Sequence, residues 1–429
     1  MNRGTSKRIA YALGCLGLVA VYTVTWLGKP DAELAGFAQQ NAGAAPETGQ
    51  APFFQSRFAS SDLKNFAHAS AIAELPNGNL LSVWFSGSRE GAADVQIRGA
   101  IFDSNRGEWS NERVLATRES TQQGVQKYIR KLGNPVVVVT PDERLWLFYV
   151  SVSVGGWGGS SINAMYSDDL GDSWSTPRQL VTSPFLNIST LVRGAPIMHA
   201  DGSIGLPIYH EFLGKFAEYL YLDRNGVVVD KFRISHGNHS LQPSVVPLGE
   251  RTAVALLRYA GDELHRVLAS RTEDGGKTWS TPVPLTPNNP NSSLAAIVTP
   301  RHGLLVALND LVDGRFRLSL YGTDVQLQKW TPLLDLDRAP DPKITPMKGP
   351  DFQKLVRDYF QTAGMAHEGM DDMVNSLVRR ICKYGTCDPT YDYPYVIRDT
   401  AGRYHLVYSW NHSFIKHVSF NDAWLEQQL

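Results

Sequence analysis

The chain has 429 residues, of which 43% are hydrophobic and 19% are charged, so it can bury a large core, and this balance excludes an intrinsically disordered protein. Its formal net charge of -1 leaves no broad basic field, which argues against nucleic acid as a partner. A charged ligand would have to be recognised by local groups.

An apolar segment stands near the N-terminus. The chain begins MNRGTSKR, and Ile9 to Leu27 then form a run without a formal charge that is long enough to cross a hydrocarbon core as a helix. We therefore expect residues 1–8 to be a basic cytoplasmic tail and residues 9–27 to be a transmembrane anchor, with a cleaved signal peptide as the alternative. The rest of the chain would lie in the periplasm or outside the cell, either tethered or secreted.

Six hairpins follow a linker. Residues 28–54 are rich in Ala, Gly, Gln and Pro, which is typical of a flexible tether. From residue 55 onward, an apolar run, a turn of Pro, Asp, Asn or Gly, and a second apolar run recur, which is the pattern of a β-hairpin. The turns fall near residues 78, 143, 202, 249, 303 and 402.

The spacing of these hairpins indicates the architecture. The first four steps between turns are 47 to 65 residues long, and the last is 99. Such a period, with short strands rich in Val, Ile, Leu and Tyr, matches one four-stranded blade per repeat, and a ring of six blades leaves no long exposed sheet edge. The sequence therefore predicts an all-β protein, with a six-bladed β-propeller over residues 55–429.

The long last step contains the clearest helical periodicity, from Pro350 to about Cys382. We expect a helical insertion over residues 340–388, before the last blade. Its Met-rich face would pack on the propeller, although a lid or a partner surface is the alternative. Cys382 and Cys387 flank four residues and would form a small disulfide in an oxidising compartment, or else remain free thiols.

Two short segments share one layout of residues. Ser167 to Trp174 reads SDDLGDSW and Thr272 to Trp279 reads TEDGGKTW, and degenerate copies end at Trp109 and Trp330. The Asp carboxylate can accept backbone N–H bonds within the turn, Gly takes a positive φ, and Trp buries its ring between strands. We therefore interpret the motif as structural rather than catalytic.

These two boxes and the six hairpins resemble the Asp-box (bacterial neuraminidase repeat) sialidase superfamily, over roughly Asn65 to Phe420. The resemblance implies a site at the propeller mouth, where the innermost strands begin around the axis. All six of these starting residues are polar. They are His68, Asn134, Arg193, Gln242, Ser293 and Tyr393.

The resemblance also implies residue roles. Sialidases bind a sugar carboxylate with three arginines, attack with a Tyr that a Glu activates, and use an Asp as acid and base. Tyr393 stands where the nucleophile is expected, and Arg258 and Arg315 match two of the arginines. Arg89 and Arg193 are candidates for the missing third positive charge. For Arg258 and Arg315 the alternative role is a structural salt bridge, and for Tyr393 it is that of a phenol buried in the core with its hydroxyl hydrogen-bonded.

The sequence departs from the family pattern at three places. His68 replaces the first arginine, Gln242 replaces the Glu partner of the Tyr, and Ser409 stands where a further glutamate is expected. A neutral Gln cannot accept the proton of the Tyr, so the usual sialidase chemistry is in question. The candidate catalytic residues are Tyr393, Glu90, Gln242 and His68.

Further residues complete the predicted site. Glu90, or Asp94 as the second choice, would take the acid/base role, although a solvated loop carboxylate is the alternative. Glu211 and Asn134 would contact substrate, and Trp157 would stack on a sugar ring or pack within its loop.

The leading interpretation is an exported sialidase-like glycoside hydrolase that acts on a glycan containing an acidic sugar. The first alternative is a polysaccharide lyase, or another uronate-active enzyme, in which His68 and Tyr393 act as acid and base. The second is a non-catalytic glycan-binding or envelope assembly protein. We find no motif for a phosphate loop, haem or zinc, so we expect no cofactor and no metal.

Overall fold

The computed structural model describes residues 3–27, 32–38, 50–183, 187–237, 239–362 and 369–428. The chain divides into two compact units, Met1–Leu34 and Ala35–Leu429. The first unit contains helix α1 (Arg3–Leu27), which begins before the predicted apolar run at Ile9. In the ranges given above, no helix is long and apolar enough to cross a membrane, so the predicted transmembrane anchor is not supported.

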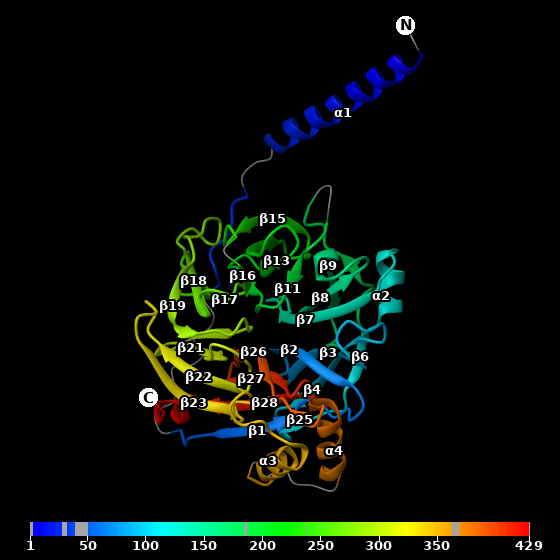
Figure 1. Cartoon of the computed structure of the whole chain (residues 1–429). Helices are drawn as coiled ribbons and strands as arrows, with labels where there is room; N and C mark the ends of the chain where they lie inside the picture. Colours follow the sequence, from blue (N-terminus) through cyan, green and yellow to red (C-terminus); the bar gives the residue numbers. More distant parts are fainter. Residues whose placement is uncertain are drawn as a thin grey trace. The chain divides into compact units, whose positions relative to one another are not determined.

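Within its described residues, the second unit holds six antiparallel sheets of four or five strands each and one small two-stranded sheet (Figure 1). The first contains β2 (Phe66–Glu74), β3 (Leu80–Gly87), β4 (Gln96–Asp103), β5 (Glu108–Trp109) and β6 (Arg113–Ala116). The second contains β7 (Lys131–Val139), β8 (Leu145–Val152), β9 (Ser160–Ser167) and β10 (Arg178–Gln179). The third contains β11 (Leu191–Val192), β12 (Ile197–Met198), β13 (Ile204–His210), β14 (Phe216–Leu222) and β15 (Val228–Arg233).

The remaining three sheets follow the same plan. The fourth contains β16 (Ser240–Pro247), β17 (Ala253–Tyr259), β18 (Arg266–Thr272) and β19 (Val283–Asn288). The fifth contains β20 (Ala295–Thr299), β21 (Gly303–Leu308), β22 (Arg317–Thr323) and β23 (Trp330–Arg338). The sixth contains β26 (Tyr391–Arg398), β27 (Arg403–Trp410), β28 (Phe414–Asn421) and β1 (Phe54–Phe58).

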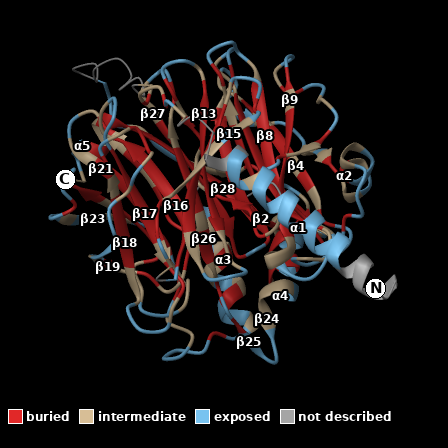
Figure 2. Ribbon diagram, turned by 90° about the horizontal axis from the view of Figure 1, so that it is seen from above, coloured by how far each residue is buried: buried red, intermediate tan, exposed pale blue. Residues whose placement is uncertain are grey.

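The last sheet closes the ring with strands from both ends of the unit. Strand β1 pairs antiparallel with β28, from Phe54 opposite Phe420 to Phe58 opposite Lys416. Because the first strand completes the last blade, the ring has no open seam between its first and last blades. The predicted six-bladed propeller is confirmed, and its strands carry most of the buried residues (Figure 2).

Part of the predicted flexible linker packs on the propeller instead. Phe37 is 1% exposed, its N–H donates to the carbonyl of Glu250 at 2.6 Å, and His199 Nδ1 donates to the carbonyl of Ala35 at 2.7 Å. The burial of one aromatic ring thus holds residues 35–38 in place. Residues 28–31 and 39–49 of the predicted linker lie outside the described residues.

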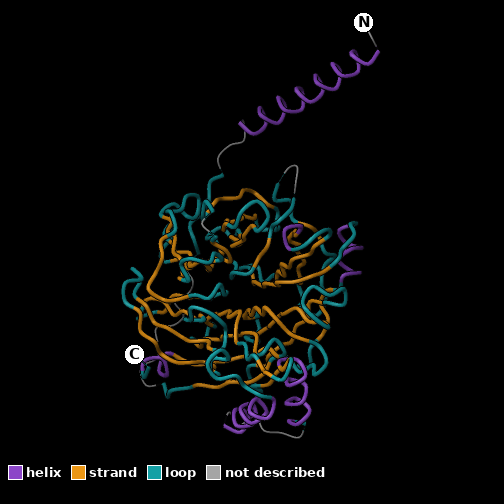
Figure 3. Tube along the Cα trace, viewed as in Figure 1, coloured by secondary structure: helices purple, strands orange, loops and turns teal. Residues whose placement is uncertain are grey.

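The helical insertion packs on the sixth blade. Helices α3 (Gly349–Thr362) and α4 (Met370–Ile381) lie beside each other outside the sheets (Figure 3). Their apolar faces share a core with Trp410 of β27, as the predicted packing on the propeller requires. The disulfide between Cys382 and Cys387 is present and joins the short strands β24 (Cys382–Lys383) and β25 (Thr386–Cys387). Two further helices are α2 (Arg118–Val125) and α5 (Asp422–Glu426).

The Asp boxes form turns that follow the third strands of their blades. The carboxylate of Asp274 accepts bonds from the N–H of Thr278 at 2.9 Å and from its hydroxyl, and the indole N–H of Trp279 donates to the carbonyl of Gly276 at 2.9 Å. The box at residues 167–174 has the same set of bonds. Each carboxylate is occupied within its own turn, which agrees with the structural interpretation.

We expect Asp274→Ala to lower the free energy of unfolding by about 1–2 kcal/mol, because the hydrogen bonds that close the turn are lost. Any activity of the protein should not change, since the Asp274 carboxylate is occupied within its own turn. Denaturant unfolding and an activity assay check the two parts, with the exposed neighbour Glu273→Ala as the matched control. A loss of activity in Asp274→Ala without a loss of stability would contradict the structural interpretation.

Candidate functional site

One backbone feature recurs where the innermost strands begin. Ala69, Asn134, Gln242 and Tyr393 have φ of 52°, 40°, 48° and 55°, in the left-handed region that residues other than glycine seldom adopt. The pairing register with the next strand shifts at each of these places. Each is therefore a β-bulge, a device that redirects side chains at functional sites.

The bulges correct the alignment predicted for the first blade. Tyr393, Gln242 and Asn134 occupy equivalent bulge positions, as predicted, but the equivalent residue in β2 is Ala69. His68 directly precedes the bulge in β2, and Asp392 directly precedes the bulge in β26, so these two residues occupy equivalent positions. One extra residue per strand moves every later position to the other face, and this shift is not visible in the hydrophobic pattern.

The hydroxyl of Tyr393 is held by two polar side chains. Gln242 Nε2 donates to it at 3.4 Å, and Arg258 Nη1 donates at 3.3 Å. Arg258 also donates to Gln242 Oε1 at 2.9 Å, which fixes the orientation of the amide. On its other side, Gln242 Nε2 donates to the buried hydroxyl of Tyr209, as does Asn134 Nδ2 at 3.0 Å. Asn134 therefore supports the site through its bond to Tyr209. The sequence did not predict that Tyr209 is part of this hydrogen-bond network.

Arg258 and Arg315 come from neighbouring blades and meet at Asn291. Arg258 Nε donates to Asn291 Oδ1 at 2.6 Å, and Arg315 Nη2 donates to its carbonyl at 2.9 Å. Both arginines are half-buried, and the Arg315 side chain is 25% exposed. The structure thus brings two of the predicted carboxylate-binding arginines together beside Tyr393.

Arg193 lies beneath the site rather than in it. Its side chain is 2% exposed, and it donates to the carbonyls of Ser70, Tyr393 and Pro394 at 3.0, 2.6 and 3.0 Å. These bonds hold the Tyr393 bulge in place and leave the guanidinium buried, so the prediction that Arg193 contacts substrate is wrong. Arg89 is exposed on the loop between β3 and β4, outside this network.

Ser409 has a structural role in the first blade. Its hydroxyl accepts a bond from the N–H of Ala69 at 3.0 Å, in the buried interior. The small side chain therefore stabilises the bulge of the neighbouring strand at the position where the family pattern has a glutamate.

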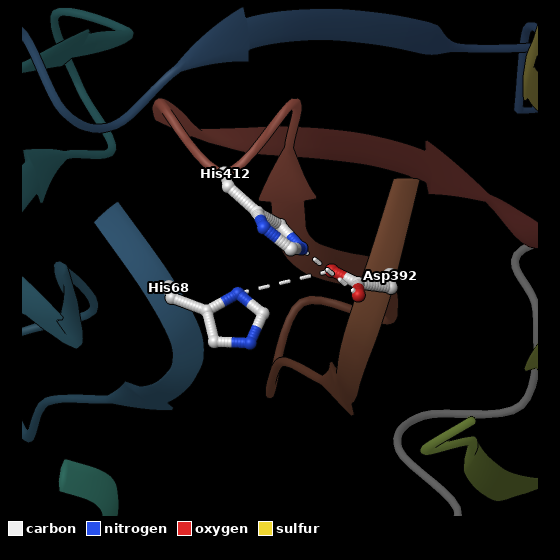
Figure 4. A group of neighbouring side chains, drawn as sticks. All are labelled: His68, Asp392 and His412. Carbon is white, nitrogen blue, oxygen red and sulfur yellow. Dashed lines mark hydrogen bonds and ion pairs between the residues drawn. The ribbon is translucent and has the colours of Figure 1, made fainter. Parts of the chain in front are cut away.

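Asp392 and His412 complete the centre, and sequence reasoning missed both (Figure 4). Asp392 is fully buried, and its Oδ2 accepts bonds from Arg315 Nη1 at 2.6 Å and from His412 Nε2 at 3.2 Å. Although burial acts in the opposite direction, His412 and Arg315 hold the pKa of Asp392 well below its ordinary value. His412 lies at the turn between β27 and β28, with 45% of its side chain exposed.

The two histidines differ in their environments. Burial lowers the pKa of His68 to about 3, despite the neighbouring Asp392 carboxylate, so its ring is neutral. For His412, burial is outweighed by the Asp392 carboxylate, which raises its pKa. The His68 ring lies 4.4 Å from the Tyr393 ring and 4.6 Å from the His412 ring, centre to centre.

The acidic residues lie at the edge of this centre. Glu90 is exposed and lies close enough to Arg315 and His412 to raise their pKa values. Glu211 is half-buried, and burial raises its pKa although Arg258 opposes the change. Asp94 instead accepts bonds from the N–H and hydroxyl of Ser88 within its own loop, which makes it a poor second choice for the acid/base role.

Trp157 packs over the start of β7. The Lys131 ammonium lies 3.7 Å from the centre of the indole ring. A Cβ at Gly133 would lie 2.7 Å from the indole, so this glycine allows the ring to lie against the strand. The indole of Trp157 therefore packs against β7 rather than within its own loop, and its stacking on a sugar stays a prediction.

One group in the described residues has the composition of a metal site. Ligand atoms of His68, Asp392 and His412 all lie within 4.8 Å of one another.

Comparisons with known proteins agree with the fold. A family model described as a BNR repeat-like domain matches residues 78–406. The Hadza microbial sialidase Hz136 is 15% identical, with a TM-score of 0.61, and the alignment covers 85% of this chain and 66% of that protein. A protein of unknown function from Dyadobacter fermentans is 12% identical, with a TM-score of 0.62 and coverage of 86% and 98%.

The intramolecular trans-sialidase from Ruminococcus gnavus, in complex with oseltamivir carboxylate, is 13% identical, with a TM-score of 0.58 and coverage of 90% and 100%. Identities this low show a shared fold only. No curated protein sequence matches the chain significantly. The predicted membership of the Asp-box (BNR repeat) superfamily is confirmed by the family match, and the structural neighbours share the fold.

Proposed function

The chain belongs to the BNR repeat-like domain family, and we propose that it is an enzyme that acts on a glycan containing an acidic sugar. One observation carries this proposal: Arg258 and Arg315, from neighbouring blades, converge beside Tyr393, Arg258 at its hydroxyl and Arg315 at 5.7 Å from its ring centre. The planar fork of an arginine pairs with both oxygens of a carboxylate. A carboxylated sugar bound by these two groups would lie next to the phenol.

The first candidate reaction is sialidase-like exo-hydrolysis. Tyr393 Oη, after releasing its proton to solvent, would attack the anomeric carbon and break the bond between that carbon and the leaving oxygen, which takes a proton from a carboxylic acid. Water would then release the sugar from the tyrosine. Glu211 suits the acid role better than Glu90, because burial raises its pKa and favours the protonated form, whereas Glu90 is exposed.

The second candidate reaction is β-elimination from a uronate, and the identity of Gln242 favours it. In the described residues, the side chains that bond the Tyr393 hydroxyl are an amide and a guanidinium, and neither can take its proton. In elimination, the neutral His68 would remove the proton next to the carboxylate, and Tyr393 would donate its proton to the leaving oxygen. An arginine would neutralise the carboxylate.

The product distinguishes the two reactions. We would assay the full chain with sialosides and with uronate polymers. Hydrolysis releases a free sugar, and elimination produces an unsaturated uronate that absorbs in the ultraviolet. Arg258→Ala and Arg315→Ala should raise KM, whereas Arg271→Ala, which removes an arginine beside the Asp box of β18, should not.

The non-catalytic alternative makes the opposite prediction. If no acidic glycan is turned over and none raises the melting temperature of the wild-type chain, the enzymatic proposal fails. Gln242→Glu supplies a further test, because sialidase activity gained by this variant would show that the site is an altered hydrolase site.

We also propose that the propeller folds in the periplasm or outside the cell. The disulfide between Cys382 and Cys387 supports this location, since such bonds persist in oxidising compartments.

A further inference from the structure

We propose that His68, Asp392 and His412 bind one divalent transition-metal cation, such as Zn²⁺, at the axis of the propeller. Two imidazoles and a carboxylate form a ligand set that suits Zn²⁺ and related metals. The three side chains come from β2, β26 and the turn between β27 and β28, and they face one another (Figure 4).

Two of the three residues have buried atoms without a partner. His68 Nδ1 and Asp392 Oδ1 are buried and make no hydrogen bond to any described residue, and they lie 3.8 Å apart. That separation is shorter than the sum of two metal–ligand bonds, about 4.2 Å, so one ion can contact both atoms. An unpaired buried polar atom is destabilising, and a cation between these two atoms would satisfy both.

The other oxygen of Asp392 is already oriented. Arg315 Nη1 donates to Oδ2 at 2.6 Å, which leaves Oδ1 directed at His68. A hydrogen bond to the second oxygen of a ligating carboxylate fixes its orientation, as the outer partners of metal ligands commonly do. Arg315 therefore positions the proposed ligand without occupying the atom that would bind the metal.

His412 is placed to supply the third ligand from the open side. Its backbone is anchored by its neighbour Asn411, which bonds Thr390 through both its N–H and its side-chain oxygen. The His412 ring is 45% exposed, so it has room to exchange its bond with Asp392 Oδ2 for a bond to the metal. Coordination positions left by the protein would face the same open side, where substrate would enter.

Such a metal would change the chemistry of the site, and this consequence rests on the proposed function. The family resemblance places an arginine where this chain has His68. A dication held by His68 would restore positive charge near Arg258 and Arg315, where the sugar carboxylate is proposed to bind. The metal would also occupy the imidazole of His68, which is the base in the proposed elimination.

The metal site is tested without any sugar. The full chain, purified without a polyhistidine tag and stripped with a chelator, is titrated with Zn²⁺ by calorimetry and with Co²⁺ by visible absorption. We expect one equivalent per chain. His412→Ala and His68→Asn should each weaken binding at least about tenfold. The exposed His236→Ala is the matched control and should bind as the wild type does.

His412→Ala removes a partly exposed side chain, so a folded protein is expected, and circular dichroism checks this. Absence of binding by the stripped wild-type chain, or unchanged affinity in both folded variants, overturns the proposed site. A final experiment compares how tightly the full chain binds N-acetylneuraminate and glucuronate with and without Zn²⁺. Equal sugar affinities overturn the role in carboxylate binding, whereas failure of both sugars to bind counts against the proposed function and not against the metal site.

Discussion

Tyr393→Phe should lower kcat by about 10³-fold or more, because the variant removes the oxygen at which Arg258 and Gln242 converge. Both candidate reactions need this oxygen, as nucleophile in hydrolysis or as proton donor in elimination. The fold should persist, since the bonds that Arg193 makes in this bulge go to backbone carbonyls, which phenylalanine retains. Steady-state kinetics and thermal unfolding of the variant measure the two effects.

Tyr395→Phe is the matched control for this result. Tyr395 lies on the same strand, its ring also lies near Arg193, and its hydroxyl donates to the carbonyl of Val137 at 3.4 Å. The variant loses a buried hydroxyl outside the site, so activity should remain. If Tyr393→Phe kept wild-type kcat, the assignment of Tyr393 to catalysis would be withdrawn.

Trp410→Ala should lower the free energy of unfolding by about 3–5 kcal/mol, the usual effect of truncating a large buried aromatic side chain. Trp410 is 2% exposed, and its ring contacts those of Phe58, Tyr359, Phe360 and Tyr391 at 5.2 to 6.2 Å between centres. These neighbours belong to the closing strand β1, the helical insertion and the innermost strand of the sixth blade. One truncation therefore weakens both ring closure and the packing of the insertion.

Denaturant unfolding measures this effect, and proteolysis would show whether the insertion is released first. Tyr384→Ala, which removes a fully exposed aromatic from the disulfide loop near the same blade, should leave the unfolding midpoint unchanged. A midpoint in Trp410→Ala equal to that of the wild type would mean that the insertion and the blade are not coupled through this ring.

The elements predicted correctly are those that local patterns encode. Each hairpin carries its own turn and its own apolar runs, and each Asp box closes on itself with bonds between residues at most four apart, as Thr272, Asp274 and Thr278 show. Patterns of this kind can be recognised without knowing how the blades meet.

The site was predicted only in part, because it is made of contacts between blades. Arg258, Arg315, Gln242 and Tyr393 lie together in the structure, and the resemblance had indicated each of them from its own motif. Their catalytic and binding roles stay predictions. Arg193 was misplaced because its burial depends on carbonyls from β2 and β26, far away along the chain.

The repeating hairpins, the propeller and the helical insertion could be predicted from the sequence, since these depend on residues close together in the chain. For Cys382 and Cys387 the sequence left free thiols as an alternative to the disulfide that the structure contains.

The side chains that face the axis depend on contacts between blades. The bulges at Ala69 and Tyr393 shift the pairing register by a residue that no hydrophobic pattern reveals, and ring closure brings His68 of the first blade to Asp392 and His412 of the sixth. The chemistry at the mouth therefore follows from blade packing, which local sequence patterns do not encode.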